Sequence, residues 1–406
     1  MEASKRLESV PPYPFVRWNK MCQAVEARGM DVIRLDVGNP DLPPPDAVVD
    51  ALCTAARDSS SHGYPGFRGK TKLREAIASY YARRFDVSLD PMTQIVPLLG
   101  SKEGIIHLSL ACLNPGDIAL VPDPGYAPYA RAARLAGATP ILLPLRAEAG
   151  YLPDLHAISI ETARKASLLW LNYPNNPTGA CANLDFLSEA VTFARKHNIV
   201  LCHDASYTDI AFDGFKPPSI LEVPGAVDVA VELNSLSKTF NMAGWRVGMA
   251  LGRPDVVSLL FQIKSNIDSG QFLPIQAAAI EALNTPSAWI DNRNTIYKER
   301  LELLAEGLQC AGLQTKAPCA TLYLWATLPT NILSEDAART LLETAGISAA
   351  PGTFFGPAGE GCLRFSVSSS TESIAIATER LKNLPTDWLH SDQLATVTCP
   401  EYWVHF

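Results

Sequence analysis

A lysine stands at the end of an apolar run in the segment VELNSLSKTFNMAGWRVGMALG, residues 231–252. Lys238 is flanked by Ser235 and Ser237, and Arg246 follows it by eight residues in a glycine-rich frame. A lysine at the end of a buried strand is costly unless it has a partner or has lost its charge. A lysine whose pKa is depressed attacks carbonyl carbon and forms a Schiff base. The segment therefore predicts carbonyl chemistry at Lys238.

The neighbours of this lysine suit an anion. Arginine offers a planar fork of donors that matches phosphate, and serine hydroxyls donate to the same kind of oxygen. Ser235 and Arg246 would thus favour a phosphate near the reacting carbonyl. Pyridoxal 5'-phosphate is an aldehyde that carries a phosphate, so these residues indicate that cofactor. Taken alone, SLSK fits an ordinary surface lysine in a loop.

Asp204 lies just past the apolar run IVLC in IVLCHDASYTD. This position predicts a strand end, where a carboxylate is poorly solvated and needs a cation. A protonated pyridine nitrogen is such a cation, and the pairing would keep the ring an electron sink. The alternative for an isolated aspartate is a helix N-cap or a structural ion pair.

The segment LNYPNNPTG supplies a third group of candidates. Pro174 and Pro177 fix two φ angles and Gly179 permits a tight turn, so the asparagines between them are held in place. Asn176 is able to hydrogen-bond a phenolate oxygen, and Tyr207, three residues after Asp204, is able to do the same from another side. As an isolated proline and asparagine loop, the segment would carry no functional meaning.

Three further positions suit a phosphate, a ring and a carboxylate. Gly100 leads into a helical pattern, so the free amides of Ser101 and Lys102 would point at an anion. Tyr126 offers an aromatic face to a ring. Arg364 alternates with apolar neighbours in GCLRFSVS, so it projects from a strand and is able to hold a carboxylate with two parallel hydrogen bonds. The alternatives are a common turn, a packing tyrosine and a surface ion pair.

The elements that position these residues follow one rhythm from about residue 90 to residue 251. Short apolar runs, turns rich in Gly, Pro, Asn or Asp, and longer helical patterns such as LDFLSEAVTFARKH alternate. This alternation predicts an α/β domain around a mostly parallel sheet. Ligands of such sheets bind outside the carboxyl ends of the strands, where most of these polar groups are expected.

The pattern changes after about residue 286. A long amphipathic helix is predicted for WIDNRNTIYKERLELLAEGLQCAG, and TLYLWATL and GCLRFSVS are strand candidates. We therefore predict a large domain over residues 49–285 and a smaller, discontinuous α+β domain made of residues 1–48 and 286–406. Residues 385–406 form a tail without an assigned role.

Composition limits the possible partners. The 406 residues are 47% hydrophobic, so the chain is long and apolar enough for a sizeable core. A net charge of -8 argues against nucleic acid or an acidic membrane surface as a partner. The nine cysteines are odd in number and have no metal-ligand spacing, which predicts free thiols, no metal site and a reducing compartment. No leader or membrane span is recognised at the sequence level, so a cytoplasmic location is expected.

The ordered motifs GSKEG, PGY, NYPNNPTG, DxxY, SLSK, GWRxG and LRFS resemble fold-type I pyridoxal-phosphate enzymes of the class I/II aminotransferase family over roughly residues 30–384. Segments such as GNPDLPPP, GYPGFRGKTKLREAIASYYARRF and IKSNIDSGQF look most like the LL-diaminopimelate aminotransferase group and its relatives. The resemblance implies a large domain with a mostly parallel seven-stranded sheet flanked by helices, and a smaller α+β domain.

The resemblance also implies roles in cofactor binding. Lys238 would be the catalytic Schiff-base lysine and proton shuttle, and Asp204 would hold the pyridine nitrogen. The remaining cofactor-binding residues would be Asn176 and Tyr207 on the phenolic oxygen, Tyr126 on the ring, and Ser101, Lys102, Ser235 and Arg246 around the phosphate. Arg364, Gly38 and Asn176 would bind the substrate. Tyr64 of HGYPG would reach the phosphate of a partner subunit, which implies a homodimer with shared active sites.

The expected reaction is transfer of an amino group between an amino acid and a 2-keto acid through a Lys238 aldimine. A lyase, decarboxylase or oxidase on the same fold is the alternative, because the same lysine, aspartate and phosphate cradle serve all these reactions. Arg364 favours transamination, since it would retain the substrate carboxylate. Cys362 stands where the diaminopimelate group often has a tyrosine, and no second arginine is assigned to a distal carboxylate, so the sequence leaves donor and acceptor open.

Overall fold

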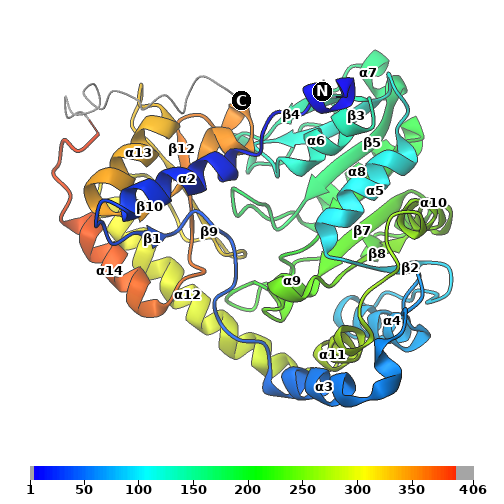
Figure 1. Ribbon diagram of the computed structural model, residues 1–406. Helices are drawn as coiled ribbons and strands as arrows, with labels where there is room; N and C mark the ends of the chain where they lie inside the picture. The colour runs from blue at the N-terminus through cyan, green and yellow to red at the C-terminus, as the bar shows by residue number, and fades with distance from the viewer. Residues whose placement is uncertain (1–3, 390–406) are drawn as a thin grey trace.

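A seven-stranded sheet forms the centre of the larger lobe in the computed structural model, which describes residues 4–389 (Figure 1). In spatial order its strands are β2 (Ile95–Leu98), β8 (Gly248–Gly252), β7 (Ala230–Ser235), β6 (Val200–Asp204), β5 (Ala166–Asn172), β3 (Ile118–Asp123) and β4 (Thr139–Pro144). All neighbouring strands from β7 to β4 pair in parallel, and β8 runs antiparallel to both β7 and β2. The predicted mostly parallel, seven-stranded sheet is confirmed.

The apolar runs of these strands are buried on both faces of the sheet. Along β5, Leu168 and Trp170 join one core layer, and Leu169 and Leu171 join the layer on the opposite face. Side chains alternate in this way because successive residues of a strand point to opposite sides. Strands covered on both faces need apolar residues at every position, which explains why the runs are continuous rather than alternating.

Helices cover both faces of the sheet. The helices of this lobe are α3 (Asp46–Arg57), α4 (Thr71–Phe85), α5 (Ser101–Cys112), α6 (Pro128–Leu135), α7 (Ile160–Lys165), α8 (Leu184–His197), α9 (Leu236–Thr239), α10 (Pro254–Ser265) and α11 (Leu273–Leu283). The predicted helix in LDFLSEAVTFARKH is α8, which begins after Asn183 and ends before Asn198. The Asn183 side chain accepts a hydrogen bond from the amide of Phe186 at 2.9 Å, and Asn198 adopts the left-handed conformation, so asparagine caps both ends.

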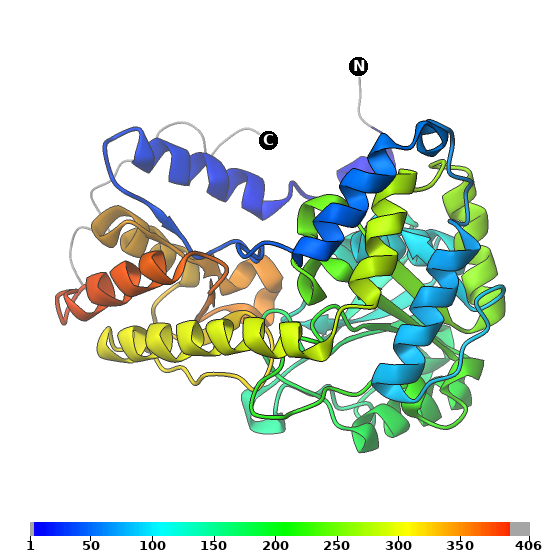
Figure 2. The same cartoon turned by 90° about the horizontal axis from the view of Figure 1, so that it is seen from below.

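The smaller lobe combines helices with two short sheets. Its strands are β1 (Ile33–Arg34) paired with β10 (Ile347–Ser348), and β11 (Ala350–Pro351), β12 (Cys362–Ser366) and β9 (Tyr323–Thr327) in an antiparallel sheet. Its longer helices are α2 (Pro14–Glu26), α12 (Ser287–Cys310), α13 (Ser334–Ala345) and α14 (Thr371–Lys382), and a short helix, α1 (Lys5–Glu8), precedes them. Figure 2 shows α2 and α12 on opposite sides of this lobe, with α12 extending toward the larger one. The predicted long helix and both strand candidates are confirmed.

One apolar core unites the two ends of the chain. Trp18 and Leu35 from the N-terminal segment pack in the same cluster as Leu301 of α12, Leu341 of α13 and Leu363 of β12. This shared core supports the discontinuous smaller domain of residues 1–48 and 286–406, which we retain as a proposal. Helix α3, which begins at the proposed boundary, packs against α11 in the larger lobe (Figure 1).

Part of the C-terminal tail also joins this core. Trp388 is 4% exposed, and its indole nitrogen donates to the carbonyl of Ala311 at 2.9 Å. The rest of the predicted tail, residues 390–406, lies outside the described residues. Within residues 4–389, no helix is both long enough and apolar enough to span a bilayer.

Candidate active site

A cavity of about 360 Å³ lies where the carboxyl ends of β5, β6 and β7 meet the smaller lobe. We call it the Lys238 cavity. Its lining residues are Tyr13, Phe15, Asp36, Val37, Gly38, Ser101, Lys102, Tyr126, Tyr129, Asn172, Asn176, Asp204, Ser206, Tyr207, Ser235, Ser237, Lys238, Ala243, Arg246, Tyr323, Phe355 and Arg364. All but one of the site residues predicted from the sequence line it. The exception is Tyr64, which is 93% exposed.

Lys238 lies in the short helix α9, directly after the end of β7. Ser235 caps this helix, because its hydroxyl accepts a hydrogen bond from the amide of Ser237 at 3.1 Å. The Lys238 ammonium donates to the carbonyl of Gly38 in the smaller lobe. Burial, together with the charges of Arg364 and Arg246, lowers the pKa of Lys238 to about 7. The amine is therefore available as a nucleophile near neutral pH.

Asp204 is the last residue of β6 and is 4% exposed. Its carboxylate accepts hydrogen bonds from the Tyr129 hydroxyl at 2.8 Å and from the Ser206 hydroxyl at 2.6 Å. Burial raises the pKa of Asp204 despite these bonds. A cation placed against this carboxylate would offset the cost of its burial.

Asn172 and Asn176 link the end of β5 to the end of β6 and to Arg364 of the smaller lobe. Asn172, the last residue of β5, donates to the carbonyl of Asp204 at 2.8 Å and accepts from the amide of Asn176 at 2.8 Å. The Asn176 side-chain oxygen in turn accepts from Arg364 at 2.8 Å. The turn between the two asparagines is thus fixed at both ends, as the prolines in NYPNNPTG predict.

Arg364 projects from β12 into the cavity and is 4% exposed. Besides Asn176, it donates to the carbonyl of Asp36 at 2.6 Å. Its guanidinium carbon lies 4.3 Å from the ring centroid of Tyr323 and 4.6 Å from that of Phe355. The Arg364 Nε atom is buried and has no partner among the described residues. A buried cation with an unused donor is suited to a carboxylate.

One part of the Lys238 cavity, at the start of α5, is shaped for an anion. Gly100 has a φ of +89°, and a Cβ at this position would lie 2.2 Å from an Arg246 guanidinium nitrogen. A Cβ on Gly248 would lie 2.6 Å from the amide nitrogen of Ser101. Both glycines therefore allow Arg246 and the first amides of α5 to approach one another. Within residues 4–389, the Arg246 guanidinium donates to the carbonyls of Ala243 and Leu99 and pairs with no carboxylate, which leaves its charge available to an anion bound at the helix start.

Tyr323 contacts both Tyr207 and Gly38. The hydroxyls of Tyr207 and Tyr323 lie 2.6 Å apart. A Cβ on Gly38 would lie 1.9 Å from the Tyr323 hydroxyl, so only glycine fits there. Burial raises the pKa of Tyr207 far above its ordinary value, so this hydroxyl keeps its proton at neutral pH.

Tyr126 and Lys102 complete the lining. The Tyr126 ring packs edge to face on Tyr129, with centroids 5.8 Å apart. The Lys102 ammonium lies 4.9 Å from the ring centroid of Tyr13. Partial desolvation, with the charges of Arg131 and Arg246, lowers the pKa of Lys102.

Sequence reasoning missed several of the residues that support these groups. Tyr129 and Ser206 bond Asp204; Tyr129 lies three residues after the tyrosine of the PGY motif, and Ser206 stands in IVLCHDASYTD. A buried carboxylate requires donors, so the hydroxyls nearest to it in these motifs were the available signal. Tyr13, Tyr323 and Phe355 gave no such signal, since aromatic residues in apolar surroundings indicate packing only.

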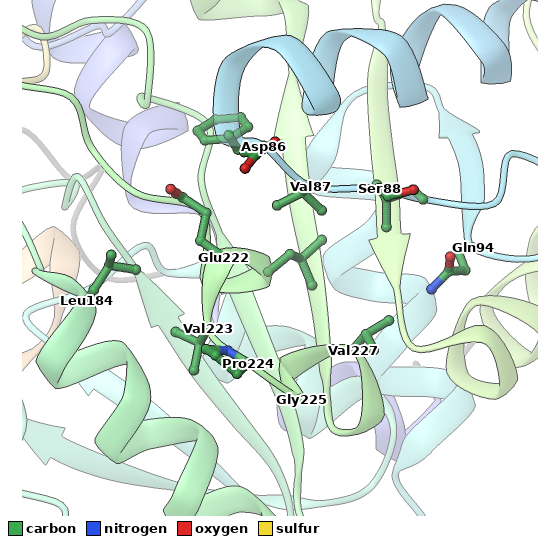
Figure 3. Close-up of a pocket in the computed structure, with 13 residues that line it drawn as sticks. Asp86, Val87, Ser88, Gln94, Leu184, Glu222, Val223, Pro224, Gly225 and Val227 are labelled. Atoms are coloured by element: carbon green, nitrogen blue, oxygen red, sulfur yellow. The ribbon is translucent and has the colours of Figure 1, made fainter.

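A second cavity of about 440 Å³ lies at the opposite end of β7, and we call it the Glu222 cavity. It is lined by Phe85, Asp86, Val87, Ser88, Leu89, Gln94, Leu184, Leu221, Glu222, Val223, Pro224, Gly225 and Val227. Figure 3 shows Asp86 and Glu222 on one side and Gln94 on another, with valines between them. Its lining contains no lysine, arginine or histidine, so it has neither a nucleophilic amine nor an anion site.

Comparison with known proteins gives consistent results. The family model for aminotransferase class I and II matches residues 30–381. The LL-diaminopimelate aminotransferase of Syntrophobacter fumaroxidans is 46% identical over 381 residues, which cover 94% of this chain and 98% of that protein. The LL-diaminopimelate aminotransferase of Moorella thermoacetica is 44% identical over 384 residues, or 95% of this chain and 98% of that protein.

Solved structures show the same architecture. Apo BacF from Bacillus subtilis superposes with a TM-score of 0.91 at 39% identity, covering 95% of this chain and 99% of that one. A probable N-succinyldiaminopimelate aminotransferase from Thermus thermophilus superposes with a TM-score of 0.85 at 38% identity, covering 91% of this chain and 99% of that one.

Proposed function

Because this chain belongs to the class I and II aminotransferase family, we propose that it transfers an amino group from LL-diaminopimelate to a 2-keto acid such as 2-oxoglutarate. The chain is an aminotransferase, and members of its family use pyridoxal phosphate. The choice of LL-diaminopimelate as donor rests on sequence similarity. The chain is 44–46% identical to LL-diaminopimelate aminotransferases over 94–95% of its length.

The residues of the Lys238 cavity fit the cofactor. The glycine-lined approach of Arg246 to the start of α5 suits a phosphate, and the buried Asp204 carboxylate suits a protonated ring nitrogen. In this proposal the phosphate is held by Ser101, Lys102, Ser235 and Arg246, the phenolic oxygen by Asn176 and Tyr207, and the ring by Tyr126 and Asp204. When bound, pyridoxal phosphate supplies an aldehyde that condenses with amines and a ring that stores the electron pair released at the substrate α-carbon.

Lys238 moves the proton in this account. With a pKa of about 7, a large share of its amine is unprotonated at neutral pH, so it is able to accept a proton from the substrate α-carbon. The Gly38 carbonyl orients this amine from the smaller lobe. Ser235 fixes the start of α9, so the lysine emerges from a helix whose direction is set by a cap.

Arg364 binds the substrate α-carboxylate in this proposal. It is held by Asn176 and the Asp36 carbonyl, and the rings of Tyr323 and Phe355 flank it. An arginine fixed on several sides loses little conformational freedom on binding. Retention of the carboxylate favours transamination over decarboxylation, since the bond to the carboxylate stays intact.

We also propose a homodimer in which Tyr64 reaches the partner's site. Tyr64 is 93% exposed, and Phe67, Ile267 and Phe272 nearby are 49%, 60% and 43% exposed. The two loops that carry these residues touch, because His62 and Phe272 have ring centroids 5.8 Å apart. An exposed apolar group of this kind suits a protein interface. The free thiols of the described cysteines support a cytoplasmic location, which we propose as well.

The test is a half-reaction followed by absorbance. Purified enzyme loaded with pyridoxal phosphate is mixed with LL-diaminopimelate, N-succinyl-LL-diaminopimelate or glutamate, and the keto acid released is measured. We expect LL-diaminopimelate and glutamate to convert the cofactor to its pyridoxamine form. Conversion by the succinylated donor alone would contradict the proposed donor, and release of ammonia or carbon dioxide without the pyridoxamine form would contradict transamination. Arg364→Lys serves as a matched control for carboxylate binding, because this variant keeps the positive charge and loses the planar fork of donors.

A further inference from the structure

Two cysteines from distant parts of the chain lie against each other. The Sγ atoms of Cys181 and Cys319 lie 3.2 Å apart, although the residues are 138 positions apart in the sequence. Cys319 is exposed and Cys181 is half-buried, so an oxidant in solution is able to reach the pair. No group of three or more metal-ligating side chains forms among the described residues, so the pair is not part of a larger metal site there.

Both cysteines stand on segments with a fixed backbone. The turn before Cys181 is closed by the amide of Asn175, which donates to the carbonyl of Ala180 at 2.8 Å. The carbonyl of Cys319 accepts from the amide of Phe212 at 3.0 Å. The two segments pack directly, because a Cβ on Gly179 would lie 2.9 Å from the Cβ of Pro318. The short distance between the sulfurs therefore follows from the packing of both segments.

We propose that Cys181 and Cys319 form a reversible disulfide that lowers the affinity of the enzyme for its amino-acid substrate. A disulfide needs its sulfurs about 2.05 Å apart, so the two sulfur atoms must approach by about an ångström. Disulfides of proteins in reducing compartments are mostly transient and redox-sensing, which agrees with the proposed cytoplasmic location.

The local environment makes Cys319 the attacking thiol. The hydrogen bond with the Cys181 thiol and the positive charge of Lys316 lower the pKa of Cys319 to about 7. The pKa of Cys181 is raised, first by this same bond and then by burial. The thiolate is the reactive form, and Cys319 is the more exposed of the two.

The oxidant is a small-molecule disulfide such as glutathione disulfide. The Cys319 thiolate attacks one of its sulfurs, which forms a mixed disulfide and releases one small thiolate. The Cys181 thiol then loses its proton and attacks the sulfur of Cys319, which releases the second small thiol. Two protein thiols are oxidised, and one small disulfide is reduced to two thiols.

The disulfide would act through two of the residues that hold Arg364. Asn176, which bonds Arg364 at 2.8 Å, lies five residues before Cys181. Tyr323, whose ring centroid is 4.3 Å from the Arg364 guanidinium carbon, lies four residues after Cys319. Movement of either segment as the bond forms would displace the Arg364 guanidinium and weaken its hold on the substrate carboxylate. This consequence rests on the proposed role of Arg364 in binding the substrate carboxylate.

The covalent step is tested by mass spectrometry of the loaded enzyme. After incubation with glutathione disulfide, the wild type should lose the mass of two hydrogens, and digestion should yield one linked peptide pair that contains Cys181 and Cys319. Dithiothreitol should reverse both changes. Cys181→Ser should instead keep a glutathione on Cys319, and Cys53→Ser should behave as the wild type, since Cys53 is exposed elsewhere. Glutathione retained on Cys319 in the wild type, without the linked pair, would overturn the proposal.

Steady-state kinetics of the same samples test the consequence. We expect oxidation to raise the KM for the amino donor about tenfold and to change kcat less than threefold, and Cys181→Ser should show no such change. Unchanged kinetics in a fully linked sample would overturn the effect on substrate affinity. The mass measurement does not depend on which amino donor the enzyme uses. A failure of the proposed donor is therefore distinguishable from a failure of the proposed disulfide.

Discussion

The two cavities at the ends of β7 are similar in volume and differ in charge. The Glu222 cavity encloses about 440 Å³ and the Lys238 cavity about 360 Å³. The first is lined by two carboxylates, Asp86 and Glu222, and by no cation. The second gathers two lysines, two arginines and two aspartates where the carboxyl ends of parallel strands meet the smaller lobe.

The ionisable groups of the two cavities also have different partners. In the Glu222 cavity, the Glu222 carboxylate accepts from the amide of Ser219 as part of a helix cap, a structural role, and burial raises its pKa. In the Lys238 cavity, the pKa of Lys238 is lowered and that of Asp204 is raised. Neither volume nor one shifted pKa therefore identifies the reactive cavity, whereas shifted groups of opposite charge that converge on one space do. The predictions below test this difference.

The largest effect is expected from Lys238→Ala. Loss of the amine removes both the nucleophile and the proton carrier, so kcat should fall by about 10⁴-fold or more. Single-turnover measurement of keto acid release from LL-diaminopimelate checks this. A fall of less than about tenfold would place the reactive amine elsewhere.

Asp204→Asn comes next. The amide keeps the shape of the side chain and removes the charge that would hold a protonated ring nitrogen, so kcat should fall by about 10²–10³-fold. The fold should be retained, because Tyr129 and Ser206 keep a hydrogen-bonding neighbour; circular dichroism is the control. Unchanged turnover with normal cofactor binding would contradict the role given to Asp204.

Arg364→Lys should weaken substrate binding more than turnover. Lysine loses the parallel pair of hydrogen bonds and the stacking between Tyr323 and Phe355, a loss of about 2 kcal/mol or about 30-fold in KM. Initial rates over a range of donor concentrations separate KM from kcat. An equal fall in kcat without a change in KM would show that Arg364 acts on the reaction step instead.

The lowered pKa of Lys238 predicts a pH dependence. Only the unprotonated amine attacks the cofactor, so capture of pyridoxal phosphate by cofactor-free enzyme should rise about tenfold per pH unit below about pH 7 and level off above it. An ordinary lysine, with a pKa near 10.5, would give a rate that continues to rise beyond about pH 9. Stopped-flow absorbance between about pH 5.5 and pH 9.5 distinguishes the two profiles.

The smallest effect is expected in the Glu222 cavity. Glu222→Gln weakens a helix cap, so the free energy of unfolding should fall by about 0.5–1 kcal/mol, while kcat/KM stays within about twofold of the wild type. Urea unfolding and initial rates are the measurements. A loss of activity of more than about tenfold in a folded variant would remove the distinction between the two cavities.

Most of the fold was predictable because apolar runs with turn residues between them determine a parallel sheet. The residues at strand ends were predictable for the same reason. Asp204 and Lys238 follow runs that must be buried, so each charged group needs a partner or a shifted pKa.

The segments that enter from the smaller lobe were harder to place. Tyr13 and Tyr323 reach the cavity through contacts between parts of the chain far apart in sequence, and local pattern carries no information on such contacts. The Cys181 and Cys319 pair was missed because spacing in the sequence does not reveal a tertiary approach.

The central claim is that Lys238 is the amine that binds the cofactor covalently. It is tested by loading the enzyme with pyridoxal phosphate, reducing it with borohydride, and mapping the modified peptide by mass spectrometry. The pyridoxyl group is expected on Lys238, in the peptide that contains SLSK, and Lys102 should remain unmodified. A pyridoxyl group on another lysine, or none in enzyme that shows activity, would contradict the assignment of the Lys238 cavity as the active site.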